Sequence, residues 1–114
     1  DYKNIIYTIA GHAGNGNFHI IPLMDFNNTD TVPQILELSD RVYKLVLDYR
    51  GSITAEHNDG IIRTPYLAFM FGPGMYELFG KVKTIFDPKF ILNPKKKYGA
   101  TIEDIKRYIQ KPTI

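Results

Sequence analysis

The fold is decided by the stretch Gly11-His12-Ala13-Gly14-Asn15-Gly16-Asn17-Phe18-His19, which holds two of the three histidines in this 114-residue chain. An Asn-Gly pair favours a type I′ turn, because both central positions of that turn need a positive φ. A turn at Asn15-Gly16 pairs His12 with His19 on one face of an antiparallel hairpin, with Cβ atoms about 4.5–5.5 Å apart. The sequence therefore predicts a hairpin that brings two imidazoles within reach of one ion.

The composition places the chain among ordinary globular domains. It is 44% hydrophobic and 23% charged, and its length suits one domain at most. The lack of cysteine excludes disulfides, thiol nucleophiles, zinc–thiolate sites and iron–sulfur ligation. No apolar run approaches the roughly 18 residues of a membrane-spanning helix. A strand is expected within four residues of Asp1, so we expect the chain to be a piece of something larger.

Charge is distributed unevenly along the chain. Residues 1–80 hold five Lys/Arg and nine Asp/Glu, whereas residues 81–114 hold nine Lys/Arg and three Asp/Glu. A basic end can meet an anionic membrane, a nucleic acid or an acidic partner domain. Because no nucleic-acid motif or interleaved aromatic residues accompany it, we favour a solvated basic surface and expect no nucleic-acid partner.

The pattern of apolar residues predicts an α+β fold. The expected elements, in chain order, are strands at 5–10 and 18–23, a helix from 31 to about 49, a strand at 51–55, a helical turn at 65–71, a helix at 75–86 and a short helix after 101. Thr31 and Gln34 have the form of a capping box, as do Thr101 and Asp104. Helices on one face of a thin three-stranded sheet indicate an incomplete domain, so we expect dimerisation through a strand edge.

His12, His19 and Glu56 form the sharpest group of candidate functional residues. Two neutral imidazoles and a carboxylate suit zinc or manganese and leave positions open for a substrate. The predicted helix at 31–49 can return Glu56 to the hairpin. The alternative is that the two histidines only form hydrogen bonds in a glycine-rich loop.

His57 and Arg63 extend this group. His57 follows Glu56 directly, and it can act as a general base beside a metal-bound hydroxyl only if the loop bends there. Arg63 can bind the carboxylate of an anionic substrate through two hydrogen bonds, although an isolated arginine is often a plain surface residue. The glycines of the hairpin lack the strand–loop–helix context of a phosphate-binding loop, which argues against a nucleotide site.

Three linked motifs resemble the C-terminal (cap) domain of FAD-linked oxidases, the vanillyl-alcohol-oxidase-type flavoproteins. They are the stretch at 11–19, Ala55-Glu56-His57 with Gly60, and Phe86-Asp87-Pro88 through Ile91-Leu92-Asn93-Pro94. The family includes D-lactate dehydrogenases, glycolate oxidase and D-2-hydroxyglutarate dehydrogenases. The similarity covers residues 5–98, which gives a cap segment at 1–98 and a helical tail at 99–114, with a ferredoxin-like sheet.

The resemblance implies FAD-dependent oxidation of a D-2-hydroxy acid to the 2-oxo acid. By position in its motifs, His12, His19 and Glu56 match the metal ligands, His57 matches the proton acceptor, and Asn93 matches an asparagine near the flavin. The flavin is bound mainly by a separate N-terminal domain of the same polypeptide, so the isolated piece should be inactive. We expect a location in the cytoplasm or at the inner face of a membrane.

The chain departs from the family pattern at several positions. Ile21 stands where a substrate-facing asparagine is common, and Lys95 stands where glycine usually follows Asn-Pro. Asn58 and Asp59 replace glycine and an apolar residue, a form that resembles larger oxidases fused to iron–sulfur modules. The competing hypothesis is a non-enzymatic metal-binding or protein-interaction module that keeps only the fold.

Overall fold

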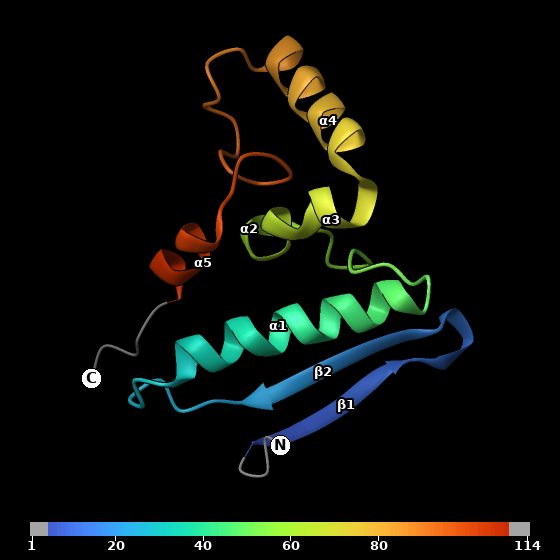
Figure 1. The fold of residues 1–114 in the computed structure, drawn as a ribbon, viewed down its shortest axis with the longest axis vertical. Helices are drawn as coiled ribbons and strands as arrows, with labels where there is room; N and C mark the ends of the chain where they lie inside the picture. The colour runs from blue at the N-terminus through green and yellow to red at the C-terminus, as the bar shows by residue number, and fades with distance from the viewer. Residues whose placement is uncertain (1–4, 110–114) are drawn as a thin grey trace.

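The computed structural model describes residues 5–109, and it begins with the predicted hairpin (Figure 1). Strand β1 (Ile6–His12) and strand β2 (Asn17–Leu23) form a two-stranded antiparallel sheet. His12 is paired with Asn17, and Ala10 is paired with His19. The predicted pairing of His12 with His19 is therefore wrong by two residues.

The register differs because only one turn residue adopts a left-handed conformation. Ala13–Asn15 form a 3₁₀ turn, and Gly16 follows with φ 63° and donates its N–H to the Ala13 carbonyl at 3.1 Å. A four-residue loop built around a right-handed turn needs one left-handed residue, whereas a type I′ turn needs two. Because the shift is an even number of residues, every strand side chain keeps its predicted face.

Helix α1 (Thr31–Asp48) is confirmed, but its ends differ from the prediction in detail. Its N-cap is Asp30, and no side chain caps it, so the predicted capping box at Thr31 is wrong. The Thr31 hydroxyl instead donates to a carbonyl of the preceding loop. At the other end Arg50 takes the left-handed conformation, with φ 56°, and Gly51 follows it rather than occupying that position itself.

The third predicted strand does not form within the described residues. The Ser52 hydroxyl donates to the Thr54 carbonyl at 2.7 Å and accepts from the Thr54 N–H at 3.1 Å. These local side-chain bonds satisfy backbone groups that a strand would pair with its neighbour. Ile53 between them is buried, so the apolar signal came from a core residue and not from a strand.

The second half of the described chain is helical, much as predicted. Its elements are α2 (Gly60–Arg63), a 3₁₀ turn (Thr64–Tyr66), α3 (Leu67–Phe71), α4 (Pro73–Phe86) and α5 (Ile102–Tyr108). Proline at the first position of α4 and Asp87-Pro88 after it set the ends of that helix. The capping box of Thr101 and Asp104 is confirmed at α5.

A small core lies on the side of α1 away from the hairpin. Buried Ile53, Tyr66 and Ile105 form it, and α1 contributes the partly buried residues Leu36, Tyr43, Val46 and Leu47. Figure 1 shows the resulting order, in which α1 lies between the hairpin and the group of α2, α3 and α5. The predicted α+β class, a small antiparallel sheet with helices, is therefore confirmed.

The molecule is flat and open around the hairpin. Its radius of gyration is 15.7 Å, with extents of 46 × 39 × 21 Å, whereas a compact chain of this length would have a radius of about 13 Å. Every residue of β1 is exposed, including Ile6 and Ile9. Among residues 5–109, no helix combines the length and apolar character needed to cross a membrane.

Asp104 couples α5 to the preceding segment through a charge that should make stability depend on pH. The hydrogen bond from Lys95, followed by that from the Thr101 N–H, lowers the pKa of Asp104 to about 2. The pKa of Asp104 in the folded state is therefore below the value of about 3.9 that Asp has in an unfolded chain. As a result, the ionised carboxylate stabilises the fold at pH values above about 3.9. Its contribution is lost as the pH falls towards 2.

Replacing Asp104→Asn should therefore lower the midpoint of thermal unfolding at pH 7, with a difference from wild type that shrinks towards pH 2. Circular dichroism melts between pH 2 and 7 measure it. Glu103→Gln is the matched control, since the exposed Glu103 pairs with Lys106 within the same helix. A midpoint difference for Asp104→Asn that stays constant with pH would contradict the assignment.

Candidate functional site

The hairpin places its two histidines on the same face at its loop end. His12 is the last residue of β1, and His19 lies on β2 two residues beyond the partner of His12. Diagonal neighbours on one face of a sheet lie within reach of long side chains. The two rings accordingly meet edge to face, with centroids 5.5 Å apart.

Glu56 reaches these histidines from the loop between α1 and α2. Its Oε2 lies 2.9 Å from Nε2 of His12 and 3.4 Å from Nε2 of His19. Asn17, the strand partner of His12, donates its side-chain N–H to the same oxygen at 3.1 Å. The three residues predicted as metal ligands are therefore brought together, with one ligand atom from each lying within 4.8 Å of the others.

Two of the distances in this group have the lengths found between ligands of one divalent ion. Ligand atoms bonded to zinc at about 2.1 Å lie about 3.0–3.4 Å apart, which matches the distances from Glu56 to the two imidazoles. Two nitrogens and one oxygen leave further coordination positions open. The side chains of His12 and Glu56 are 57% and 47% exposed, so those positions are accessible from outside this chain.

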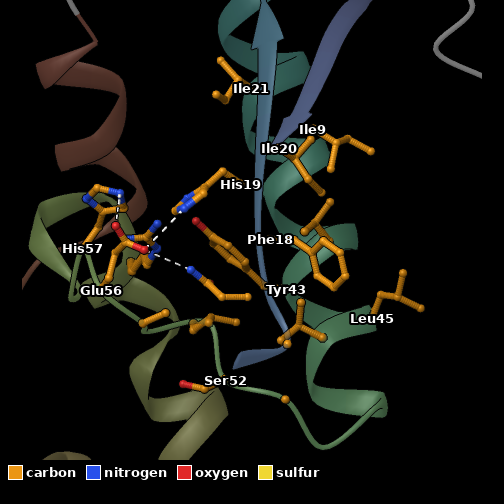
Figure 2. A pocket seen from close by; sticks show the side chains of 18 residues that line it. Ile9, Phe18, His19, Ile20, Ile21, Tyr43, Leu45, Ser52, Glu56 and His57 are labelled. Carbon is orange, nitrogen blue, oxygen red and sulfur yellow. Dashed lines mark hydrogen bonds and ion pairs between the residues drawn. The ribbon is translucent and has the colours of Figure 1, made fainter. Parts of the chain in front are cut away.

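His57 also joins the group, because the loop bends directly after it. Asn58 has φ 55°, and its N–H donates to the Ala55 carbonyl at 2.9 Å, which closes a turn around Glu56 and His57. His57 Nε2 consequently lies 3.7 Å from Glu56 Oε1, and its ring is 5.5 Å from that of His19. Figure 2 shows His57, Glu56 and His19 side by side.

Arg63 and Tyr43 line the same pocket as His19, Glu56 and His57 (Figure 2). Arg63 ends α2, and its guanidinium donates to the Asn58 carbonyl at 2.6 Å. Burial raises the pKa of the Tyr43 hydroxyl, while the guanidinium of Arg63 beside it acts in the opposite direction. The predicted substrate-binding arginine thus belongs to this pocket and has a phenol as its neighbour.

The remainder of the pocket is largely apolar. Its lining comes from both strands of the hairpin and from α1, and it includes Ile9, Phe18, Ile20, Ile21, Val42, Leu45 and Val46. Ile21, which stands where the resemblance implies a substrate-facing asparagine, also lines this pocket. His19, Glu56 and His57 lie together at one end of the pocket, which we call its polar end (Figure 2).

Asn93 is not brought to this pocket. It lies in the loop after α4 with φ 46°, and its carbonyl accepts the N–H of Lys96 at 3.3 Å. Any contact it makes with a cofactor is therefore separate from the group around Glu56.

Two residues of the site were missed by reasoning from the sequence. Asn17 lies two positions before His19 on β2, so period-two alternation already places both on one face. Tyr43 could not be found in this way, because it is one of many residues on the buried side of α1 and no local pattern distinguishes it.

Comparisons with known proteins agree with the motifs of this site. A family model described as "FAD linked oxidases, C-terminal domain" matches residues 1–97. "Probable D-lactate dehydrogenase, mitochondrial" of Danio rerio is 36% identical over 94 residues, which cover 82% of this chain and 19% of that protein. "D-2-hydroxyglutarate dehydrogenase" of Haemophilus influenzae is 33% identical over 96 residues, covering 84% of this chain and 9% of that protein.

A third relative is "Glycolate oxidase subunit GlcD" of Bacillus subtilis, 32% identical over 89 residues, which cover 78% of this chain and 19% of that protein. The chain thus spans a fifth or less of the length of these relatives. No solved structure matches the chain significantly.

The close contact at Gly11 should control how the two histidines meet. A Cβ added at Gly11 would lie 2.2 Å from the Asn17 carbonyl oxygen, whereas a Cβ at Gly14 meets nothing within 4 Å. Gly11→Ala should therefore force the strands apart and separate the His12 and His19 rings. Gly14→Ala should leave them in place.

The measurement is the nuclear Overhauser effect between the two imidazoles, which should be lost in Gly11→Ala and kept in Gly14→Ala. Equal effects in both variants would show that the hairpin does not depend on this approach.

Proposed function

Because this chain belongs to the family of FAD-linked oxidase C-terminal domains, we propose that it supplies the metal and substrate contacts of an FAD-dependent oxidoreductase. The reaction is the oxidation of a D-2-hydroxy acid, of lactate, glycolate or 2-hydroxyglutarate type, to the 2-oxo acid. Relatives whose names carry these three activities support the proposal.

The single observation that carries this proposal is the convergence on Glu56. One ligand atom from each of His12, His19 and Glu56 lies within 4.8 Å of the others, and His57 stands beside them. A divalent ion, zinc or manganese, would be held by these three side chains. A substrate hydroxyl on one of its open positions would then lie close to the His57 imidazole.

In the proposed reaction, His57 accepts the proton of the substrate hydroxyl. When bound, the divalent ion acidifies the substrate hydroxyl and FAD accepts the hydride. His57 takes the hydroxyl proton, as the hydride leaves the carbon that bears that hydroxyl and the C=O double bond forms. A neutral imidazole suits this role, because histidine changes protonation near neutral pH.

Arg63 binds the substrate carboxylate in this proposal, and Tyr43 assists it. One guanidinium nitrogen is engaged with the Asn58 carbonyl, which leaves other N–H donors of the guanidinium for an anion. The Tyr43 hydroxyl, beside the guanidinium, adds a further donor. The carboxylate and hydroxyl of one small hydroxy acid would thereby be fixed at the polar end of the pocket.

The rest of the reaction depends on parts outside this pocket. We infer that the FAD-binding domain of the same polypeptide brings the flavin, and that Asn93 contacts it, as its place in the closing motif implies. The 114 residues alone should then be catalytically silent. Pairing with a second copy through a strand edge, and a location in the cytoplasm or at the inner face of a membrane, stay predictions.

Metal binding can be tested on the chain by titration with Zn²⁺ or Mn²⁺ in a calorimeter. Replacing His12→Ala or His19→Ala should weaken binding at least tenfold, because each removes a ligand. His57→Ala should bind as wild type does, since His57 is not among the three ligands. Undetectable binding by wild type, or binding that survives the double His12→Ala/His19→Ala change, would refute the metal site.

The activity is tested in the polypeptide that carries this chain together with its FAD domain. Mixing it with a panel of D-2-hydroxy acids should bleach the flavin absorbance. His57→Gln should slow this reduction by about 10²–10⁴-fold, while metal affinity stays unchanged. Arg63→Lys should raise KM more than it lowers kcat, because an ammonium does not bind a carboxylate through two parallel hydrogen bonds.

Absence of flavin reduction by every acid in the panel would favour the non-enzymatic module or another substrate class.

A further inference from the structure

Lys97 reaches from the segment after α4 to the loop that carries Glu56 and His57. Its Nζ donates to the Asn58 side-chain oxygen at 3.0 Å and forms an ion pair with the Asp59 carboxylate, 38 residues away. Its backbone N–H donates to the Thr64 hydroxyl at 2.9 Å. Both ends of this residue are therefore attached to the region directly after the site.

The Asp59 carboxylate is buried and depends on Lys97 to compensate its charge. The side chain is 1% exposed, and only its Oδ2 is paired with Lys97. Its Oδ1 has no hydrogen-bond partner within residues 5–109. Removing one member of a buried ion pair leaves an uncompensated charge, which is strongly destabilising. Without Lys97, this stretch of backbone would have to move in order to reach water.

Asn58 transmits any such movement to the site. It sits in the left-handed conformation that bends the chain after His57, and its side-chain oxygen also accepts the Asp59 N–H at 3.0 Å. The Lys97 ammonium shares that oxygen. The hydrogen bond from Lys97 to Asn58 therefore stabilises the bend that turns the His57 imidazole towards Glu56.

The segment that carries Lys97 is itself well anchored. Asp87 accepts the N–H groups of Ile91 and Leu92 at 3.1 and 2.9 Å, which fixes its start. The Gly99 N–H donates to the Tyr76 hydroxyl at 2.9 Å, and Lys95 pairs with Asp104. Because this segment is held in place by these contacts, Lys97 can determine the position of the loop that carries Glu56 and His57.

We propose that Lys97 is a positioning residue. Its contacts with Asn58 and Asp59 set where the Glu56 carboxylate and the His57 imidazole stand relative to the hairpin histidines. The inference rests on the proposed function in so far as those groups bind metal and accept a proton. Lys97 also connects the segment that contains Asn93 to the loop of the site, because Lys97 belongs to that segment and contacts Asn58 and Asp59 of the loop.

The test compares Lys97→Met with Lys96→Met in the full 114-residue chain by Mn²⁺ titration. Lys96 is the matched control, since its side chain makes no hydrogen bond or ion pair with residues 5–109. Lys97→Met should weaken Mn²⁺ binding about tenfold, the lower end of what losing an outer-shell partner costs. Lys96→Met should bind as wild type does, whereas unchanged affinity in Lys97→Met would overturn the proposal.

A second variant covers the case in which Lys97→Met fails to fold. The double change Asp59→Asn/Lys97→Met removes the buried charge together with its partner, so it should recover thermal stability. The contact from Lys97 to Asn58 is still missing, and Mn²⁺ affinity should therefore stay below that of wild type. Full recovery of affinity would show that Lys97 serves stability alone, which would overturn the positioning role.

A metal-free readout separates this proposal from the proposed function. The ¹H–¹³C cross-peaks of the His57 ring should shift in Lys97→Met and stay in place in Lys96→Met. If wild type binds no Mn²⁺ but these peaks move as expected, the metal site fails and the positioning role stands. Peaks that do not move in Lys97→Met overturn the positioning role, whether or not the metal binds.

Discussion

The Glu56 carboxylate is the contact on which the site depends. It meets His12, His19 and Asn17 from the hairpin through one oxygen, while its other oxygen faces His57. A carboxylate among imidazoles compensates positive charge, whether that charge is a bound cation or a protonated ring. One side chain thereby fixes the position of the hairpin tip and the charge balance of the group.

The open architecture follows from where the apolar residues are buried. The core of Ile53, Tyr66 and Ile105 lies on one side of α1, and the hairpin lies on the other with much of its apolar surface exposed. The group of His12, His19 and Glu56 therefore lies at a rim, and the side chains of His12 and Glu56 are about half exposed. Such a site suits a cap that closes over a flavin held elsewhere, which is the arrangement proposed for this family member.

Three of the positions expected to depart from the family pattern, Asn58, Asp59 and Lys95, make contacts that shape or tie together segments near the site. Asn58, in place of glycine, takes a left-handed conformation that asparagine tolerates better than most residues. Asp59, in place of an apolar residue, is buried and recruits Lys97. Lys95, also in place of glycine, pairs with Asp104 at the start of α5. The Lys97–Asp59 pair thus joins the site loop to the closing segment, and the Lys95–Asp104 pair joins that segment to α5.

Local sequence patterns predict which residues share a face of the hairpin, where α4 ends and which side chains have the chemistry of a metal site. These features follow from local rules: period-two alternation, proline at helix boundaries and the ligand preferences of divalent ions. The histidines met even though the predicted register was wrong, because an even shift preserves the face. The strand predicted at 51–55 is replaced by local hydrogen bonds between Ser52 and Thr54. The folded structure was needed to show that Tyr43 lies beside Arg63 and that Lys97 pairs with Asp59. Those outcomes depend on contacts between distant segments, which no local pattern in the sequence specifies.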